Sequence, residues 1–265
     1  MSQIFGVRLH HLDSERQLRE LCDRFLRADR TVRIFTPNPE ILLRARDDPA
    51  YAEVLRSADL ALPDGTGVAL VETLRTRRPV RRWPGVEIAE MLVRIGAERD
   101  AIIAFVGGRQ GVAERAAQRW RQRLPGVRIH VVGGDATITD DGFAHPAELD
   151  VDLTSDVAAL SPAIVLVAFG APKQERWIAQ HAAFFPTARI MIGIGGSFDM
   201  WATDLRRAPP LLRSVGLEWA WRLALEPRRW PRMIRATIVF PLLVLLDRQK
   251  RAPVIPRARP NDLRR

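Results

Sequence analysis

The chain has 265 residues, and 47% of them are hydrophobic, which excludes a disordered protein and fits one large α/β domain or one domain with an appendage. Its one cysteine, Cys22, cannot form an intramolecular disulfide, so we expect a reducing compartment. The net charge of +10 is uneven, because residues 222–265 carry 12 Lys and Arg against 3 Asp and Glu. Such a tail predicts an anionic partner, namely phosphate groups, anionic lipid or nucleic acid, unless its arginines only add solubility.

The N-terminus lacks the basic segment and long apolar run of a signal peptide, so none is expected. No stretch reaches about 18 consecutive apolar residues, so we also expect no membrane-spanning helix.

Six short apolar runs rich in β-branched residues predict strands, in chain order at 31–35, 58–62, 101–106, 127–132, 163–169 and 189–194. Segments with helical spacing lie between them, for example 86–95, 112–124 and 173–184. Apolar strands alternating with amphipathic helices are typical of a parallel sheet covered on both faces. We therefore predict an α/β fold that is Rossmann-like and doubly wound, with a mostly parallel sheet.

The composition changes near residue 205. Residues 205–247 contain several Arg, Trp and Pro and include an apolar stretch, 233–246, which is too short to span a bilayer but suits its interface. Residues 248–265 are rich in Pro and Arg and are expected to be disordered. We thus divide the chain into a core (1–204), a C-terminal helical appendage that associates with membrane and completes the site (205–247), and a basic tail (248–265).

Nearly every predicted strand is followed by a loop that combines Gly or Pro with a polar residue. Ligands of doubly wound sheets bind outside the carboxyl ends of the strands, so these loops predict a site for a large polar ligand. The loops are 36–39, 63–67, 107–111, 133–135, 170–175 and 195–199.

Asp64 directly follows a predicted strand, in the sequence Leu-Pro-Asp-Gly-Thr-Gly. Gly65 and Gly67 permit a close approach of the backbone to a ligand. A carboxylate in this place suits a general base and suits a cap of the following helix equally well. Thr36 and Asn38 can hydrogen-bond sugar hydroxyls or an acetamido group, although such residues beside prolines are also common in turns.

Gly107 and Gly108 begin a Gly-Gly-x-x-Gly loop between a predicted strand and a predicted helix. Such a loop presents backbone N–H groups to phosphate, although it lacks the full spacing of a dinucleotide fingerprint. With Asp135 in place to bind a ribose, an NAD-dependent oxidoreductase is an open alternative.

Asp150 and Asp152 match the D-x-D pattern that binds metal in many enzymes. They do not follow a buried strand, and we interpret them as solvated turn or cap residues ahead of a helix. The five histidines show no ligand spacing, and the adjacent His10 and His11 are expected near a surface turn. No metal and no other cofactor is predicted.

Arg222, Arg229 and Arg232 flank tryptophans in the appendage. Guanidinium groups bind phosphate through a planar fork of donors, so these arginines could neutralise a phosphate leaving group in place of a metal. The alternative is an amphipathic helix whose tryptophans pack on the core.

Eight motifs occur in order, and their combination is more specific than any one of them. The sequence resembles the WecG/TagA/CpsF glycosyltransferases, family 26, from about residue 5 to about residue 245. The motifs are Thr-Pro-Asn-Pro-Glu (36–40), Pro-Asp-Gly-Thr-Gly-Val (63–68), Arg-x-x-Gly-Val (82–86), Val-Gly-Gly-x-x-Gly-Val-Ala (106–113), Phe-Gly-Ala-Pro-Lys-Gln-Glu (169–175), Ile-Gly-Gly-Ser-Phe-Asp (194–199), Arg-Ala-Pro (207–209) and Glu-Trp-x-Trp-Arg-Leu-x-x-Glu-Pro-x-Arg-x-x-Arg (218–232).

The resemblance implies an inverting, metal-independent transfer from a UDP-sugar to a sugar on a polyprenyl diphosphate, in cell-surface polysaccharide or teichoic-acid-type synthesis. It implies a cytoplasmic protein held peripherally on the inner face of the cell membrane, with an anionic membrane surface as a partner. A homo-oligomer is compatible with it. A nucleic-acid-binding protein is a further alternative, but the basic charge is confined to the tail and does not extend along the strand-end loops.

By motif position, the resemblance implies that Asp64 is the general base. Thr36 and Asn38 would contact the acceptor or donor sugar, and Arg82 and Gln174 would be polar contacts in the active site.

The appendage arginines Arg222, Arg229 and Arg232 would stabilise the diphosphate. Trp201 begins a segment that departs from the family pattern and is expected to reshape the donor pocket. The remaining candidates for substrate binding are Gly65, Gly107, Gly108, Gly196 and Asp199.

Overall fold

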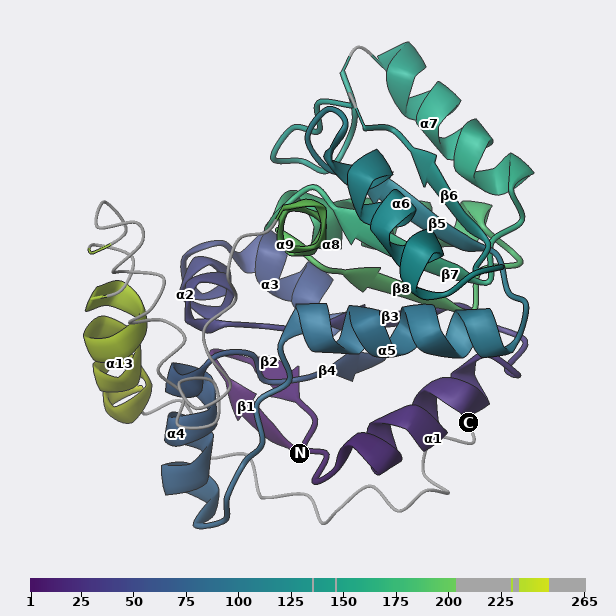
Figure 1. The fold of residues 1–265 in the computed structure, drawn as a ribbon. Helices are drawn as coiled ribbons and strands as arrows, with labels where there is room; N and C mark the ends of the chain where they lie inside the picture. The colour runs from purple at the N-terminus through teal and green to yellow at the C-terminus, as the bar shows by residue number, and fades with distance from the viewer. Residues whose placement is uncertain (135, 146, 204–229, 231–233, 248–265) are drawn as a thin grey trace.

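The computed structural model describes residues 1–134, 136–145, 147–203, 230 and 234–247. Its centre is a six-stranded parallel sheet in the order β4-β3-β8-β7-β5-β6, with helices on both faces (Figure 1). All six predicted strands are present, and the predicted doubly wound α/β fold is confirmed. The strands are β3 (Val32–Phe35), β4 (Leu60–Ala61), β5 (Ile103–Gly107), β6 (Ile129–Val132), β7 (Ile164–Ala168) and β8 (Ile190–Gly193).

Each face of the sheet packs against its own set of helices. Every residue of β5 and β8 is buried, and alternate residues of β5 enter opposite apolar clusters, as a sheet covered on both faces requires. One face carries α1 (Glu15–Phe25), α5 (Gly85–Glu98), α6 (Val112–Arg123) and α9 (Ser197–Ala202). The other carries α2 (Pro39–Asp47), α3 (Pro49–Arg56), α7 (Ala147–Ala159) and α8 (Lys173–His181), which the short turn Ala182–Phe184 extends.

The direction in which the chain adds strands reverses between β5 and β7. From β5 the chain moves outward to β6, whereas from β7 it moves the opposite way, to β8. The helices that follow these two strands, α6 and α8, therefore lie on opposite faces of the sheet. A crevice forms outside the carboxyl ends of strands at such a switch point, and ligands of this fold bind there.

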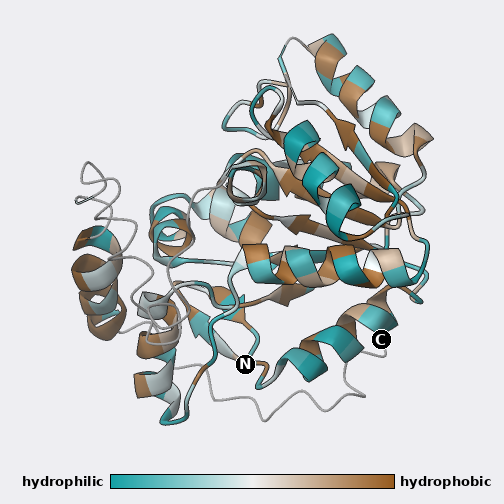
Figure 2. Ribbon diagram, viewed as in Figure 1, coloured by the Kyte–Doolittle hydropathy of each residue, from teal (hydrophilic) through white to brown (hydrophobic). Residues whose placement is uncertain are grey.

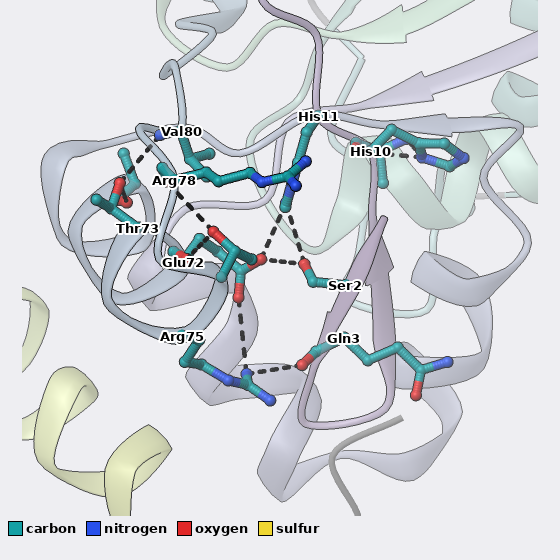
Figure 3. Close-up of polar contacts among 12 residues, drawn as sticks. Ser2, Gln3, His10, His11, Glu72, Thr73, Arg75, Arg78 and Val80 are labelled. Atoms are coloured by element: carbon teal, nitrogen blue, oxygen red, sulfur yellow. Dashed lines mark hydrogen bonds and ion pairs between the residues drawn. The ribbon is translucent and has the colours of Figure 1, made fainter. Parts of the chain in front are cut away.

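An N-terminal hairpin that the sequence analysis did not predict holds α4 (Thr66–Thr76) in place; its strands are β1 (Ser2–Ile4) and β2 (Val7–Leu9). Figure 3 shows the fully buried Glu72 of α4 accepting hydrogen bonds from the Ser2 hydroxyl and from His11 Nε2, the latter at 2.9 Å. Arg75 completes the cluster by donating to the Gln3 carbonyl oxygen at 2.8 Å. These contacts fix the helix that begins immediately after the Asp64 turn.

The C-terminal helix also lies beside α4. It consists of the π-helical turn η3 (Arg235–Val239) and α13 (Phe240–Leu246), which pack beside α2 and α4 (Figure 1). Phe240 and Val244 are buried there, and the Phe240 ring meets Phe5 edge-on, with 6.2 Å between ring centroids. Residues 204–229 lie outside the described part of the chain, so the division into core and appendage stays a prediction.

The prediction that His10 lies near a surface turn is wrong. His10 is 8% exposed, its backbone N–H donates to the Ala61 carbonyl oxygen at 2.7 Å, and its Nδ1 accepts from the Ala61 N–H at 3.1 Å. The residue thus extends the contact of the hairpin with β4. Burial lowers the pKa of His10 to about 4, because a charged imidazole would be desolvated.

We expect His10→Asn to remove part of the acid sensitivity of folding. Neutral His10 gains a proton near pH 6.5 only when unfolded, so the free energy of unfolding falls between pH 6.5 and pH 4, by on the order of 3 kcal/mol in total. An asparagine Oδ1 can accept from Ala61 and does not titrate. Urea unfolding of both proteins at several pH values measures the difference, and equal pH dependence in the two would contradict this role.

Candidate functional site

A cavity of about 320 Å³ lies at the switch point, within the size range of small-molecule sites. Its walls come from the loops after β5, β7 and β8, with Gly108, Gly170, Gly195 and Gly196 among the lining residues. Glycine is needed at the entrance to the first loop, because a Cβ on Gly107 would lie 2.3 Å from the Phe169 ring, and the φ of Gly107 is +78°. The strand-end loops therefore expose backbone to the cavity, as the sequence predicted.

Charged side chains surround this cavity. Lys173 and Arg109 both line it, and Asp199 faces it while accepting a hydrogen bond from Arg109 Nη2 at 2.6 Å. Arg109 is 82% exposed, so it is accessible to a ligand from solvent. Two cationic groups beside exposed backbone suit an anionic ligand, such as a diphosphate.

A second group of candidate residues gathers at the neighbouring strand ends, around the Asp64 turn. The Asp64 N–H donates to the Pro37 carbonyl oxygen at 3.1 Å, which joins the turns after β4 and β3. The Trp83 N–H donates to the Pro63 carbonyl oxygen at 2.7 Å, which holds the segment containing Arg82 beside the same turn.

The start of α5 closes this group from the side. A Cβ on Gly85 would lie 3.1 Å from Thr36 Oγ1 and 3.8 Å from the Gly193 carbonyl oxygen, so the helix start, β3 and β8 meet there. The structure thus brings Thr36, Asn38, Asp64, Gly65 and Arg82 to one place on the sheet edge. Gly107, Gly108, Gly196 and Asp199 lie at the cavity on the same edge.

One residue of this group, Asn38, serves the fold as well. Asn38 is the N-cap of α2, and its Oδ1 accepts from the Ile41 N–H at 3.0 Å, so its local role is at a helix start instead of in a turn. A hydrogen bond to substrate would come from its Nδ2. Thr36 is 8% exposed, and only a small part of its side chain is accessible. Asp64 precedes Gly65, which occupies the N-cap position of α4.

Gln174 lies between the two groups and is 4% exposed. Its Oε1 accepts from the Gly195 N–H at 2.9 Å, and its Nε2 donates to Glu175 Oε1 at 2.7 Å. Glu175 Oε2 in turn accepts from the Tyr51 hydroxyl at 3.0 Å. Burial raises the pKa of Glu175, an effect that the hydrogen bonds from Gln174 and Tyr51 oppose.

Several residues at or behind the site were missed by the sequence analysis. Arg109 and Lys173 lie inside quoted motifs, and their position after a strand end could have identified them. Tyr51 could not be found in this way, because it belongs to a helix and approaches Glu175 only through tertiary packing.

One sequence interpretation needs correction. Asp150 lies within α7 instead of ahead of it, and its carboxylate, which is 14% exposed, receives hydrogen bonds from His181 Nε2 and the Ala144 N–H at 2.9 Å each. Asp152, also in α7, is exposed, and the described residues contain no cluster of His, Cys, Asp and Glu able to hold a metal. Trp201 itself is buried in the core against Phe105. Residue 204 of the segment that it begins lies outside the described residues, so the effect of this segment on a donor pocket stays a prediction.

The C-terminal helix reaches the Asp64 turn through Gly67. A Cβ on Gly67 would lie 2.8 Å from the Ala236 carbonyl oxygen and 3.8 Å from the Phe240 ring, so helix η3 packs directly on the start of α4. Arg222, Arg229 and Arg232 lie outside the described residues, and their role stays a prediction.

The fold and these loops define an α/β protein with a ligand site at the strand ends of a doubly wound sheet. A family model described as "Glycosyl transferase WecG/TagA/CpsF family" matches residues 2–253. The chain therefore belongs to this family and is a glycosyltransferase, which confirms the resemblance seen in the motifs and decides against the NAD-dependent oxidoreductase.

Three similar proteins carry the name N-acetylglucosaminyldiphosphoundecaprenol N-acetyl-beta-D-mannosaminyltransferase. The protein of Bacillus spizizenii (strain W23) is 33% identical over 201 residues, which cover 76% of this chain and 74% of that protein. The protein of Bacillus subtilis (strain 168) is 31% identical over 224 residues, or 84% and 83% of the two chains. The protein of Staphylococcus aureus (strain MRSA252) is 30% identical over 201 residues, or 76% and 74%.

We expect Gly67→Ala to loosen the C-terminal helix selectively. The new methyl group must displace the Ala236 backbone, which should cost about 1–3 kcal/mol of unfolding free energy. Amide hydrogen exchange between residues 236 and 244 should accelerate. Gly96→Ala is a matched control, because its methyl would overpack Ile103 in the core, at 2.6 Å. Equal exchange in the two variants would show that Gly67 does not hold this helix.

Proposed function

We propose that the chain transfers a sugar from a UDP-sugar to the sugar of a polyprenyl-diphosphate-linked acceptor, with inversion and without a metal. The observation that supports this most strongly is that the Asp64 turn and the cationic cavity lie on one sheet edge. The names of the three relatives describe transfer of N-acetylmannosamine to such a lipid-linked acceptor. They favour a UDP-N-acetylhexosamine as the donor.

The donor would occupy the cavity. Its nucleotide and diphosphate would lie against Gly108, Gly196 and the neighbouring backbone, near Arg109 and Lys173. Preorganised cations and N–H groups stabilise negative charge that develops on a leaving diphosphate. Arg222, Arg229 and Arg232 would add to this charge from the C-terminal segment, in place of a metal.

The acceptor would approach from the side of β3 and β4. From β4 to β7 the sheet spans three strand spacings, or about 14 Å, which leaves room for a sugar between the Asp64 turn and the cavity. Thr36, Asn38 and Arg82 would orient the acceptor sugar there. Asp64 would take the proton of its attacking hydroxyl as that oxygen bonds to the anomeric carbon, while UDP leaves from the opposite face with the bonding electrons.

Asp64→Asn should lower kcat by about 10²- to 10⁴-fold, the contribution of a general base, while UDP binding is retained. Asp59→Asn is a suitable control, because Asp59 lies at the other end of the same strand, where it pairs with Arg30 and Arg33. Turnover of a synthetic polyprenyl-diphosphate sugar measures both, and the wild-type rate should persist in EDTA. A near-normal rate for the asparagine variant would refute the assignment of the base.

The described residues also support binding to an anionic membrane surface. None of the helices within them is long and apolar enough to cross a membrane. Instead, the packed pair α4 and α13 exposes apolar side chains, and Figure 2 shows brown segments on both helices. Leu70 and Leu74 are 56% and 60% exposed, and Leu242 and Leu245 are 53% and 62% exposed. An apolar helix face flanked by basic residues suits the interface of an anionic bilayer.

Basic residues border this apolar surface. Arg77 and Arg78 follow α4 and are exposed, and Arg235 is exposed at the start of η3. Each would add about 1 kcal/mol of attraction to anionic lipid. Because α4 begins just after the Asp64 turn, binding through this surface would bring the base close to a lipid-linked acceptor.

The double variant Leu242→Ser and Leu245→Ser should bind anionic liposomes at least about tenfold more weakly, because each buried leucine contributes roughly 1.5–3 kcal/mol. Leu149→Ser with Val151→Ser is the matched control, since these residues are 45% and 64% exposed on α7, at the far end of the molecule (Figure 1). Co-sedimentation measures both. Equal loss in the two variants, or loss in neither, would contradict membrane binding through α13.

A further inference from the structure

A buried chain of hydrogen bonds runs from α3 to the cavity wall. It passes from the Tyr51 hydroxyl to Glu175, from Glu175 to the Gln174 amide, and from that amide to the Gly195 N–H, with distances of 3.0, 2.7 and 2.9 Å. Tyr51, Glu175 and Gln174 are each less than 5% exposed, whereas Gly195 lines the cavity. This chain of hydrogen bonds thus connects helix α3 in the core with the wall of the cavity.

The donors and acceptors of this chain are determined by chemistry. Burial raises the pKa of Tyr51, so its hydroxyl keeps its proton and donates. Glu175 accepts on both oxygens, one from the Tyr51 hydroxyl and the other from the NH₂ group of Gln174, so this NH₂ group faces Glu175. The amide oxygen of Gln174 is therefore turned toward Gly195, which needs an acceptor.

The end of strand β8 leaves space for the Gln174 side chain. A Cβ on Gly193, the last residue of β8, would lie 2.7 Å from Gln174 Nε2 and 2.9 Å from its Cδ. Only a glycine at that position lets the amide lie across the end of the strand. The turn that follows, at Gly195 and Gly196, forms part of the cavity wall.

We propose that Tyr51, Glu175 and Gln174 are positioning residues for the donor, and that Gln174 acts by holding the Gly195 turn instead of binding substrate through its amide. The inference rests on the proposed function, because it takes the cavity as the donor site. It explains why Lys173, Gln174 and Glu175 stand in a row: the first faces the cavity, the second holds its wall and the third orients the second.

Gln174→Glu tests the chain by removing one donor group without changing the size of the side chain. Two carboxyl groups then face each other with no amide N–H between them, and Gly195 loses a well-oriented acceptor. We expect the donor KM to rise about ten- to hundredfold, as for a buried polar group left without its hydrogen-bond partner, with the acceptor KM unchanged. The assay is run at about pH 8.5, where a proton shared between the two carboxyl groups is least favoured.

The swap Gln174→Glu with Glu175→Gln should restore the donor KM to within about threefold of the wild type, because every hydrogen bond can form again with a single carboxylate. The carboxylate at position 174 would accept from Gly195 and from the amide at position 175, and the oxygen of that amide would accept from Tyr51. If Gln174 instead donates to substrate, the swap cannot rescue it, because a carboxylate has no N–H. A swap variant as impaired as the single variant would overturn the proposal.

Tyr51→Phe gives a second test at a residue remote from the cavity wall. It removes the outermost donor, and the donor KM should rise severalfold while kcat stays within about twofold. An unchanged donor KM in this variant would overturn the proposal even if the swap failed to fold.

Thermal unfolding without substrate separates failure of this inference from failure of the proposed function. Gln174→Glu should lower Tm by about 5 °C, and the swap should recover most of the loss. If UDP-sugars do not raise the wild-type Tm, the proposed function fails, yet this recovery should still be seen. Absence of the recovery in a protein that does bind UDP-sugar would count against the chain of hydrogen bonds alone.

Discussion

The parallel pairing of β3 with β8 is the contact on which the site depends. It aligns Val32 with Ile190 and Ile34 with Ile192, residues far apart in the sequence, and so joins the strand pair β3–β4 to the sheet that holds the cavity. Without this pairing the Asp64 turn and the cavity would belong to separate units. Because all six strands are parallel, their carboxyl ends form one edge, and a carboxylate and a cationic pocket can serve one pair of substrates.

The edge is built from backbone as much as from side chains. Glycines at the ends of β5, β7 and β8 allow the loops to turn sharply and leave the cavity open, and several have positive φ. Such loops need support, because they have no large side chains of their own to pack. The hydrogen bonds from Tyr51 to Gly195 give that support behind the cavity. On the side of β4, Glu72 and the N-terminal hairpin hold α4.

Much of the fold could be predicted from sequence, because buried parallel strands are continuous apolar runs with a clear end. The N-terminal hairpin was missed, since its three-residue strands are too short to show a pattern. The loop glycines and Asp64 could also be found, because they directly follow the clear ends of these apolar runs. The roles of His10, Glu72 and Tyr51 could not, because burial and long-range partners decide them. Asp150 was misjudged because α7 begins before it.

In the proposed mechanism two subsites share one sheet edge, with the donor at the cavity and the acceptor at the Asp64 turn. Hydrogen exchange in the presence of UDP tests this most directly. We expect slower exchange in the loops 107–111, 170–175 and 195–199, while the loops 36–40 and 63–67 stay unchanged until a lipid-linked acceptor is added. Slower exchange with UDP alone at 36–40 and 63–67, and none at the three cavity loops, would contradict it.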